Sequence, residues 1–232
     1  LSHAGTTRRI QPEIKKLSRQ RFSNPMSQTA FYYPQKMGRL ILLSMEEVIG
    51  KSGLDAIFDL VVGDELTQSH PSASNERTFS FEAIRQLHLA LEQAYGPRGG
   101  RGLALRTGRA CFKYGLKEYG SLLGLTEMAF RLLPLSTKLH TGARSFADLF
   151  NKHTDQQVRV EETDTHILWH IERCPLCWER TAAETICHLA VGLLQEALYW
   201  LSGGKVFSVE ETACHARGDE RCTITILKAP LT

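Results

Sequence analysis

The sequence predicts an α+β fold in which one antiparallel sheet packs against several helices. Over most of the first 155 residues, apolar side chains recur every three or four positions, which is the period of an amphipathic helix. Near residue 155 the pattern changes to short segments rich in alternating, β-branched and aromatic residues, which are typical of strands. Because the expected strands gather in the last third of the chain, we expect them to pair antiparallel in a single sheet.

The helices expected in the first part are separated by glycines, a polar loop and a proline. Gly50 and Gly53 interrupt the first apolar segment, Pro71 lies in the polar loop, and Pro134 separates the last two helices. The expected helices span residues 37–50, 54–62, 81–95, 103–123, 126–133 and 143–150.

Residues 96–102 (GPRGGRG) are predicted to form a glycine-rich turn before a long helix. A helix N-terminus behind glycines can bind a phosphate or a carboxylate, and Arg101, Arg106 and Arg109 lie close enough in sequence to pair with an acidic ligand. No Gly-Lys-Ser/Thr motif closes the turn, which excludes a nucleotide-binding P-loop. A plain turn between two helices is the other interpretation of this segment.

The last third is predicted to contain a hairpin, a buried helix and two further strands. The hairpin turns at Thr163-Asp164, and Gly203 and Gly204 end the helix. That helix is apolar around much of its circumference, so we expect most of it to be buried. In chain order, these elements span residues 157–162, 165–171, 184–201, 206–211 and 223–227.

Composition and charge favour an ordinary globular protein. The chain has 232 residues, of which 42% are hydrophobic and 23% charged, with a net charge of +3. No apolar run reaches the roughly 20 residues of a membrane span, and no signal peptide is recognisable, so we expect a cytoplasmic protein. Three parts are expected: a basic extension (1–35), a mostly helical half that forms a ligand pocket (36–155), and a part with strands and cysteines (156–232).

The N-terminal extension concentrates positive charge. Residues 1–39 contain eight Lys and Arg residues and one acidic residue. Such an arm can contact nucleic acid or an anionic membrane. Because it lacks regular apolar spacing and interleaved aromatic residues, we expect a solvated extension without a specific nucleic-acid partner.

Five of the six cysteines fall within 49 positions, and in a chain without an export signal such clustering favours a metal site over disulfides. Thiolates are soft anionic donors, and four of them in tetrahedral geometry satisfy zinc. Inert buried cysteines, a redox-active CxxC pair and an iron–sulfur cluster are the alternatives. The pattern leaves six candidate ligands for four positions: Cys174, Cys177, Cys187, Glu211, Cys214 and Cys222.

A set of short motifs in this region resembles the 4-vinyl reductase domain family. The motifs cover about a quarter of the chain. They are CPLC from Cys174, ICHL around Cys187, Gly192 and Trp200, VEETAC ending at Cys214, and ARGD before Cys222. The family takes its name from a protein of bacteriochlorophyll synthesis. It includes stand-alone hydrocarbon-binding proteins, and a related domain forms the sensor of aromatic-responsive transcription activators.

The resemblance implies a fold and a zinc site. The implied fold is the ligand-binding fold shared by haem-based nitric oxide sensors and Golgi vesicle-tethering subunits. The aromatic sensors hold zinc with a helix cysteine and a Glu-x-x-Cys-x7-Cys unit, which implies Cys187, Glu211, Cys214 and Cys222 as ligands here. The CxxC pair has no counterpart in those sensors, so Cys174 and Cys177 are the second choice. Four protein ligands close the coordination sphere, which indicates a structural role.

The function expected from these observations is the binding of a hydrocarbon, an aromatic compound or a tetrapyrrole in a homodimeric protein. The alternative is a vinyl-reductase-like enzyme of tetrapyrrole metabolism, although the sequence has no recognisable catalytic motif or reductant-binding site. Apolar pockets with a few polar groups are the usual small-molecule sites. The expected lining consists of Arg101, Arg106, Arg109, Phe112, Tyr119, Trp169 and Trp200.

Overall fold

A computed structural model describes residues 30–61, 71–123, 130 and 132–231. The predicted basic extension falls almost wholly outside these residues, as does most of the helix expected at 126–133. Among the described residues, none of the helices has the length and apolar character needed to span a bilayer.

Two long helices form most of the N-terminal part. Helix α1 (Gln35–Leu60) bends at Gly50, and α2 (Phe81–Tyr119) bends at Gly96. Both glycines have a positive φ, near 75° and 71°, which other residues rarely adopt. The short strands β1 (Tyr32–Pro34) and β2 (Arg77–Ser80) precede these helices and pair antiparallel.

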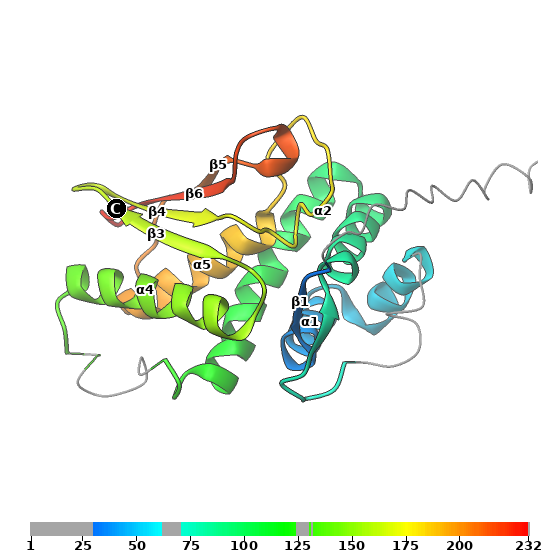
Figure 1. Ribbon diagram of the computed structural model, residues 1–232, viewed down its shortest axis with the longest axis horizontal. Helices are drawn as coiled ribbons and strands as arrows, with labels where there is room; N and C mark the ends of the chain where they lie inside the picture. Colours follow the sequence, from blue (N-terminus) through cyan, green and yellow to red (C-terminus); the bar gives the residue numbers. More distant parts are fainter. Residues whose placement is uncertain (1–29, 62–70, 124–129, 131, 232) are drawn as a thin grey trace, which may run out of the picture.

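The second part is an antiparallel sheet with two helices. Its strand order is β3-β4-β6-β5, so β6 is central although it comes last in the chain. The helices α4 (Leu135–His153) and α5 (His188–Ser202) pack against the sheet and each other, and α5 also packs against α2 (Figure 1). The strands are β3 (Val158–Glu162), β4 (His166–Ile171), β5 (Val209–Ala213) and β6 (Cys222–Leu227), with a 3-10 turn η1 (His215–Arg217).

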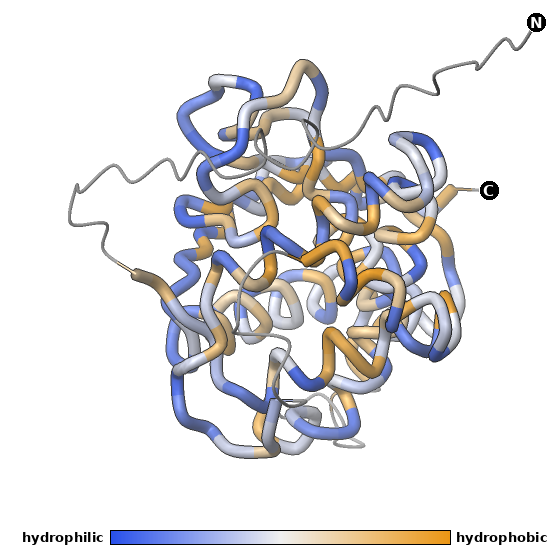
Figure 2. Tube along the Cα trace, turned by 90° about the vertical axis from the view of Figure 1, so that its right-hand side faces the viewer, coloured by the Kyte–Doolittle hydropathy of each residue, from blue (hydrophilic) through white to orange (hydrophobic). Residues whose placement is uncertain are grey.

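The core lies between the sheet and the helices. One face of the sheet contributes alternate residues such as Ile167, Trp169, Ile224 and Ile226, each at most 2% exposed. Hydrophobic stretches run through the middle of the molecule and hydrophilic stretches lie mostly toward its edges (Figure 2). The predicted α+β fold with an antiparallel sheet is therefore confirmed.

Helices α2 and α5 approach each other closely at two glycines. A Cβ added at Gly108 would lie 2.0 Å from the carbonyl oxygen of Leu189, and one added at Gly192 would lie 2.0 Å from that of Leu105. Only glycine allows the two backbones to come this close. The contact places the start of α5 and the middle of α2 in fixed positions beside the sheet.

Three local predictions are wrong. The glycine-rich turn at 96–102 is reduced to a kink at Gly96, and the helix resumes at Pro97, a residue that suits the first position of a helix. The helix expected from residue 184 begins at His188. The helix expected at 143–150 is longer, because it begins directly after Pro134 and ends at His153. The hairpin turn at Thr163-Asp164 is confirmed.

Candidate functional site

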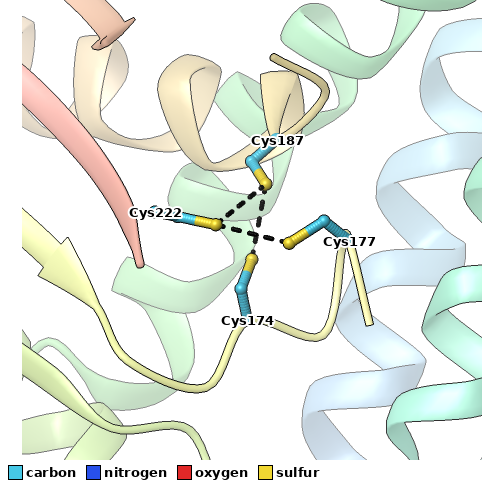
Figure 3. Close-up of side chains that lie close together, drawn as sticks. All are labelled: Cys174, Cys177, Cys187 and Cys222. Atoms are coloured by element: carbon cyan, nitrogen blue, oxygen red, sulfur yellow. Dashed lines mark hydrogen bonds between the residues drawn. The ribbon is translucent and has the colours of Figure 1, made fainter. Parts of the chain in front are cut away.

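Cysteines from three separate segments converge on one point between α5 and the sheet. Cys174 and Cys177 lie in the irregular segment 172–187 that follows β4, Cys187 is the residue before α5, and Cys222 begins β6. Their sulfur atoms point toward one another (Figure 3). All five clustered cysteines, including Cys214 after β5, are at most 5% exposed.

The spacing of the sulfur atoms suits a single tetrahedral metal centre. The Sγ atom of Cys187 lies 3.4 Å from that of Cys174, 3.9 Å from that of Cys214 and 3.8 Å from that of Cys222. The Sγ atoms of Cys177 and Cys222 are 3.3 Å apart. Four sulfurs around zinc, with Zn–S bonds of about 2.3 Å, stand about 3.8 Å from one another. The described residues therefore fit a zinc ion without rearrangement of the backbone.

Glu211 adds a carboxylate to the same cluster. It pairs with Ile224 across β5 and β6, on the face of the sheet that Cys222 also occupies. Its Oε2 accepts a 2.7 Å hydrogen bond from the backbone N–H of Cys187, whereas its buried Oε1 has no hydrogen-bond partner among the described residues. Burial and the neighbouring Cys214 raise the pKa of Glu211 to about 8. A buried oxygen without a partner is the kind of atom that a cation satisfies.

The loop between Cys214 and Cys222 is held in shape by its own polar groups. The Asp219 carboxylate accepts hydrogen bonds from the backbone N–H of Cys214, at 2.8 Å, and from the Arg217 side chain, at 2.9 Å. Gly218 turns the chain with φ near 99°. The backbone N–H of His215 donates to the Cys222 sulfur at 3.4 Å. These contacts fix both thiols before any metal binds.

The segment 172–187 is fixed from outside the cluster. The Trp178 ring packs edge-on against Phe31 and Phe81, at centroid distances of 5.2 and 5.7 Å. The Arg180 side chain, 8% exposed, forms a 2.6 Å ion pair with Glu92 of α2. The two cysteines of the CxxC motif are thereby held against the N-terminal helices.

The thiols perturb one another's ionisation. Hydrogen bonds from Cys177, Cys187 and Cys222 lower the pKa of Cys214. Hydrogen bonding among the thiols, with Cys174 contributing most, and burial raise the pKa of Cys187 well above its ordinary value. One thiolate among several thiols is the state that begins to bind a soft cation and then releases the remaining protons.

An apolar cavity of about 100 Å³ lies next to the cluster, between the helices and the sheet. Side chains from α1, α2, α4, β4 and α5 line it. Cys174, Pro175 and Leu176 also belong to its wall, so the loop that carries the CxxC motif separates the cavity from the cysteine cluster.

Few polar groups reach the cavity. The Tyr33 hydroxyl donates a hydrogen bond to Gln156. The Tyr119 hydroxyl is buried and has no hydrogen-bond partner among the described residues. Burial raises the pKa of Tyr119 to about 12, so this phenol stays protonated and can donate a hydrogen bond. The cavity therefore combines an apolar wall with one free donor.

The residues expected to bind ligand fall into two groups. Phe112, Tyr119 and Trp169 line the cavity. Arg101, Arg106 and Arg109 are exposed on α2, where Arg109 donates to Gln195 at 2.8 Å, and they do not belong to the cavity lining. Trp200 also lies outside that lining and contacts Phe112 at a centroid distance of 6.2 Å.

The sequence analysis missed several parts of this site. It did not recognise the cavity wall formed by Pro175 and Leu176, although the CPLC motif contains both. It also missed the contribution of α1, through Met37 and Ile41, and the Tyr33–Gln156 pair. These residues are far apart in sequence, so no local pattern connects them.

The cysteine-rich segment decides the comparison with known families. Residues 168–228 match the family model of the 4-vinyl reductase domain. The match covers β4, the CxxC segment, α5, β5 and β6, which is where the sequence motifs resemble that family. The resemblance is confirmed over these residues. No match was found among curated proteins.

Solved structures of H-NOX proteins share the fold. The Fe(II) unliganded H-NOX protein of K. algicida is 15% identical, with a TM-score of 0.55 over 86% of this chain and 97% of that chain. An H-NOX protein of S. oneidensis in the Fe(II)NO ligation state is 10% identical, with a TM-score of 0.56 over 84% and 99%. The phenol-responsive sensory domain of the transcription activator PoxR is 18% identical, with a TM-score of 0.48 over 75% and 88%. The H-NOX likeness confirms the predicted fold.

Proposed function

We propose that this chain binds a small aromatic or hydrocarbon molecule in the cavity and holds zinc in the adjacent cysteine cluster. The observation that carries the proposal is the apolar cavity of about 100 Å³ beside the clustered thiols. An apolar cavity of roughly 150 Å³ can hold benzene. A single-ring compound is therefore the size class that the cavity accepts with a small expansion of its wall.

The polar groups narrow the ligand class further. The free Tyr119 hydroxyl favours a ring that carries a hydroxyl or carbonyl group, because that group would satisfy a buried donor. No lysine or arginine belongs to the lining among the described residues, which disfavours an anionic ligand. Phenol is the simplest probe with the matching chemistry, and toluene is the matching apolar probe.

A tetrapyrrole suits this cavity poorly. Four linked rings need several times the volume of one, and no histidine lines the cavity among the described residues to bind a haem iron. Cys111 does line it, but burial raises the pKa of its thiol to about 12, which disfavours a thiolate ligand. These residues do not fit haem. The volume equally disfavours the alternative function, a vinyl-reductase-like enzyme acting on a chlorophyll precursor.

Zinc suits the cluster better than an iron–sulfur centre does. Within each candidate group of four donors, all ligand atoms lie within 4.8 Å of one another. In a cubane cluster each cysteine binds a different iron, so its sulfurs stand farther apart. The zinc would connect segment 172–187, α5 and β6 and thereby fix the cavity wall. We expect Cys222→Ser, which removes a donor common to both groups, to lower the zinc content and the stability.

Thermal unfolding with phenol and with toluene tests the ligand proposal. A ligand at about 100 times its Kd stabilises the folded state by about 2.7 kcal/mol, and we expect saturating phenol to raise Tm by several degrees. Ala190→Leu should abolish the shift, because Ala190 lines the cavity and a larger side chain fills it. Ala183→Leu, the same change at an exposed position, is the control. An unchanged Tm with every single-ring probe would contradict the proposal.

Homodimer formation and a cytoplasmic location stay predictions. Light scattering coupled to size-exclusion chromatography measures the first, and fractionation of the source cells measures the second. A monomer at micromolar concentration would contradict the expected dimer without affecting the proposed ligand or metal.

A further inference from the structure

The donors of the cysteine cluster form two groups that overlap. One group contains Cys174 and Cys177 with Cys187 and Cys222, and the other contains Glu211 and Cys214 with the same two cysteines. Within each group all ligand atoms lie within 4.8 Å of one another. Since zinc takes four protein ligands in a closed site, a single ion leaves two of these donors unused, whichever group it occupies.

The unused pair is buried in either case. Cys174 and Cys177 are 5% and 1% exposed, and Cys214 is fully buried. Protonated thiols tolerate burial well. The Oε1 atom of Glu211 does not, because it is buried without a hydrogen-bond partner among the described residues. A single ion in the all-cysteine group leaves this oxygen unsatisfied, and a single ion in the other group leaves the CxxC pair without a role.

We propose that the cluster binds two divalent ions of the zinc class, bridged by the thiolates of Cys187 and Cys222. The first ion takes Cys174 and Cys177 as its remaining ligands, and the second takes Glu211 and Cys214. The inference rests on the proposal above that the cluster binds zinc, and adds a second ion to it. The two coordination tetrahedra share one edge, the Cys187–Cys222 pair.

The shared edge has suitable dimensions. The Sγ atoms of Cys187 and Cys222 are 3.8 Å apart, and two sulfurs bound to one zinc with bonds of about 2.3 Å are separated by about the same distance. The ions lie on opposite sides of this edge, each next to the donors that belong to its own group. Bonds of about 2.3 Å to both bridging sulfurs place the two ions roughly 3 Å apart.

The charges also favour two ions. Five thiolates and one carboxylate carry six negative charges when all are ionised. Two divalent cations neutralise four of these, whereas one cation neutralises two and leaves more charge in a buried site. The cluster is therefore more nearly neutralised with two ions bound.

The positions of the donors give the second ion a distinct structural role. The bridging thiols come from the start of α5 and the start of β6, which pack together in the core. The outer donors come in pairs, one from segment 172–187 and one from the end of β5. Each ion would thus attach one of these segments to the same base.

Metal stoichiometry and 113Cd NMR test this proposal on the full chain. We expect native mass spectrometry of zinc-loaded protein to show two ions per chain. Cys177→Ser and Cys214→Ser each remove one outer donor and should leave one ion, while Cys222→Ser removes a bridge and should lose both. In cadmium-loaded wild-type protein, we expect two resonances that are coupled through the shared thiolates.

The outcomes separate the two proposals. A single cadmium resonance, with one zinc ion per chain at saturation, overturns the two-ion cluster and leaves the single zinc site intact. No bound metal at all overturns the zinc site as well. The NMR measurement uses the wild-type chain, so it decides the matter even where a cysteine variant does not fold.

Discussion

Replacing Gly192 by alanine should separate the two helices that frame the site. The new Cβ would lie 2.0 Å from the carbonyl oxygen and 2.8 Å from the carbonyl carbon of Leu105. Both are backbone atoms of α2, so no side-chain rotation relieves the clash. An ordinary contact begins at 3.4 Å, so the helices must move apart by about 1.4 Å.

The expected cost follows from the kind of contact that is lost. Overpacking costs about 1–3 kcal/mol, and a clash between two backbones belongs at the upper end. The better helix propensity of alanine offsets about 1 kcal/mol. We therefore expect a net loss of about 2 kcal/mol, which lowers Tm by roughly 4–8 °C in a chain of this size.

Urea unfolding followed by circular dichroism measures this change. Gly102→Ala is the matched control, because Gly102 lies within α2 and an added Cβ there has no neighbour within 4 Å. The control should be neutral or stabilised by up to about 1 kcal/mol. The reasoning is refuted if Gly192→Ala unfolds at the same urea concentration as the wild type.

Three further predictions concern the site. Tyr119→Phe removes the free donor of the cavity and should weaken phenol binding about fivefold or more, on the basis of about 1 kcal/mol per hydrogen bond, but leave toluene binding unchanged in calorimetry; equal losses for both probes contradict this. Glu92→Gln removes the partner of the buried Arg180 and should destabilise the chain by about 3 kcal/mol in urea unfolding; Lys51→Gln, at an exposed ion pair, is the control. In the metal-free protein, the pKa of Glu211 is raised from 4.5 to about 8. The folded state therefore binds more protons, so the contribution of this group to stability is greatest below about pH 4.5 and is lost as pH rises through about 8. We expect Glu211→Gln to flatten this part of the Tm profile, and a slope equal to that of the wild type would argue against it.

The sequence predicted the last third well because its signals are local. The hairpin over 157–171 contains alternating and β-branched residues around a polar turn, and β3 and β4 follow that pattern. The kink at Gly96 was harder to predict. Gly100 permits a close approach to Glu92, where an added Cβ would lie 2.9 Å from the Cα atom, and this lets the helix resume after one residue. A run of glycines indicates a turn only when no such packing contact supports a helix.

The donor set could be predicted only in part. The motifs identified all six donors, but sequence spacing did not rank Cys174 and Cys177 against Glu211 and Cys214. The two pairs lie on different segments, and their convergence depends on the pairing of Ile171 with Cys222 across β4 and β6. The late start of α5 has the same origin, since residues 184–187 are not helical and Cys187 is directed into the cluster.

The wall made by Cys174, Pro175 and Leu176 belongs both to the cavity and to the cysteine cluster. Two equilibria that share a structural element are thermodynamically linked, and such linkage is reciprocal. An occupant of the cavity that favours the metal-bound arrangement of this wall is itself bound more tightly when metal is present, by the same factor. The availability of zinc then sets the ligand concentration to which the chain responds.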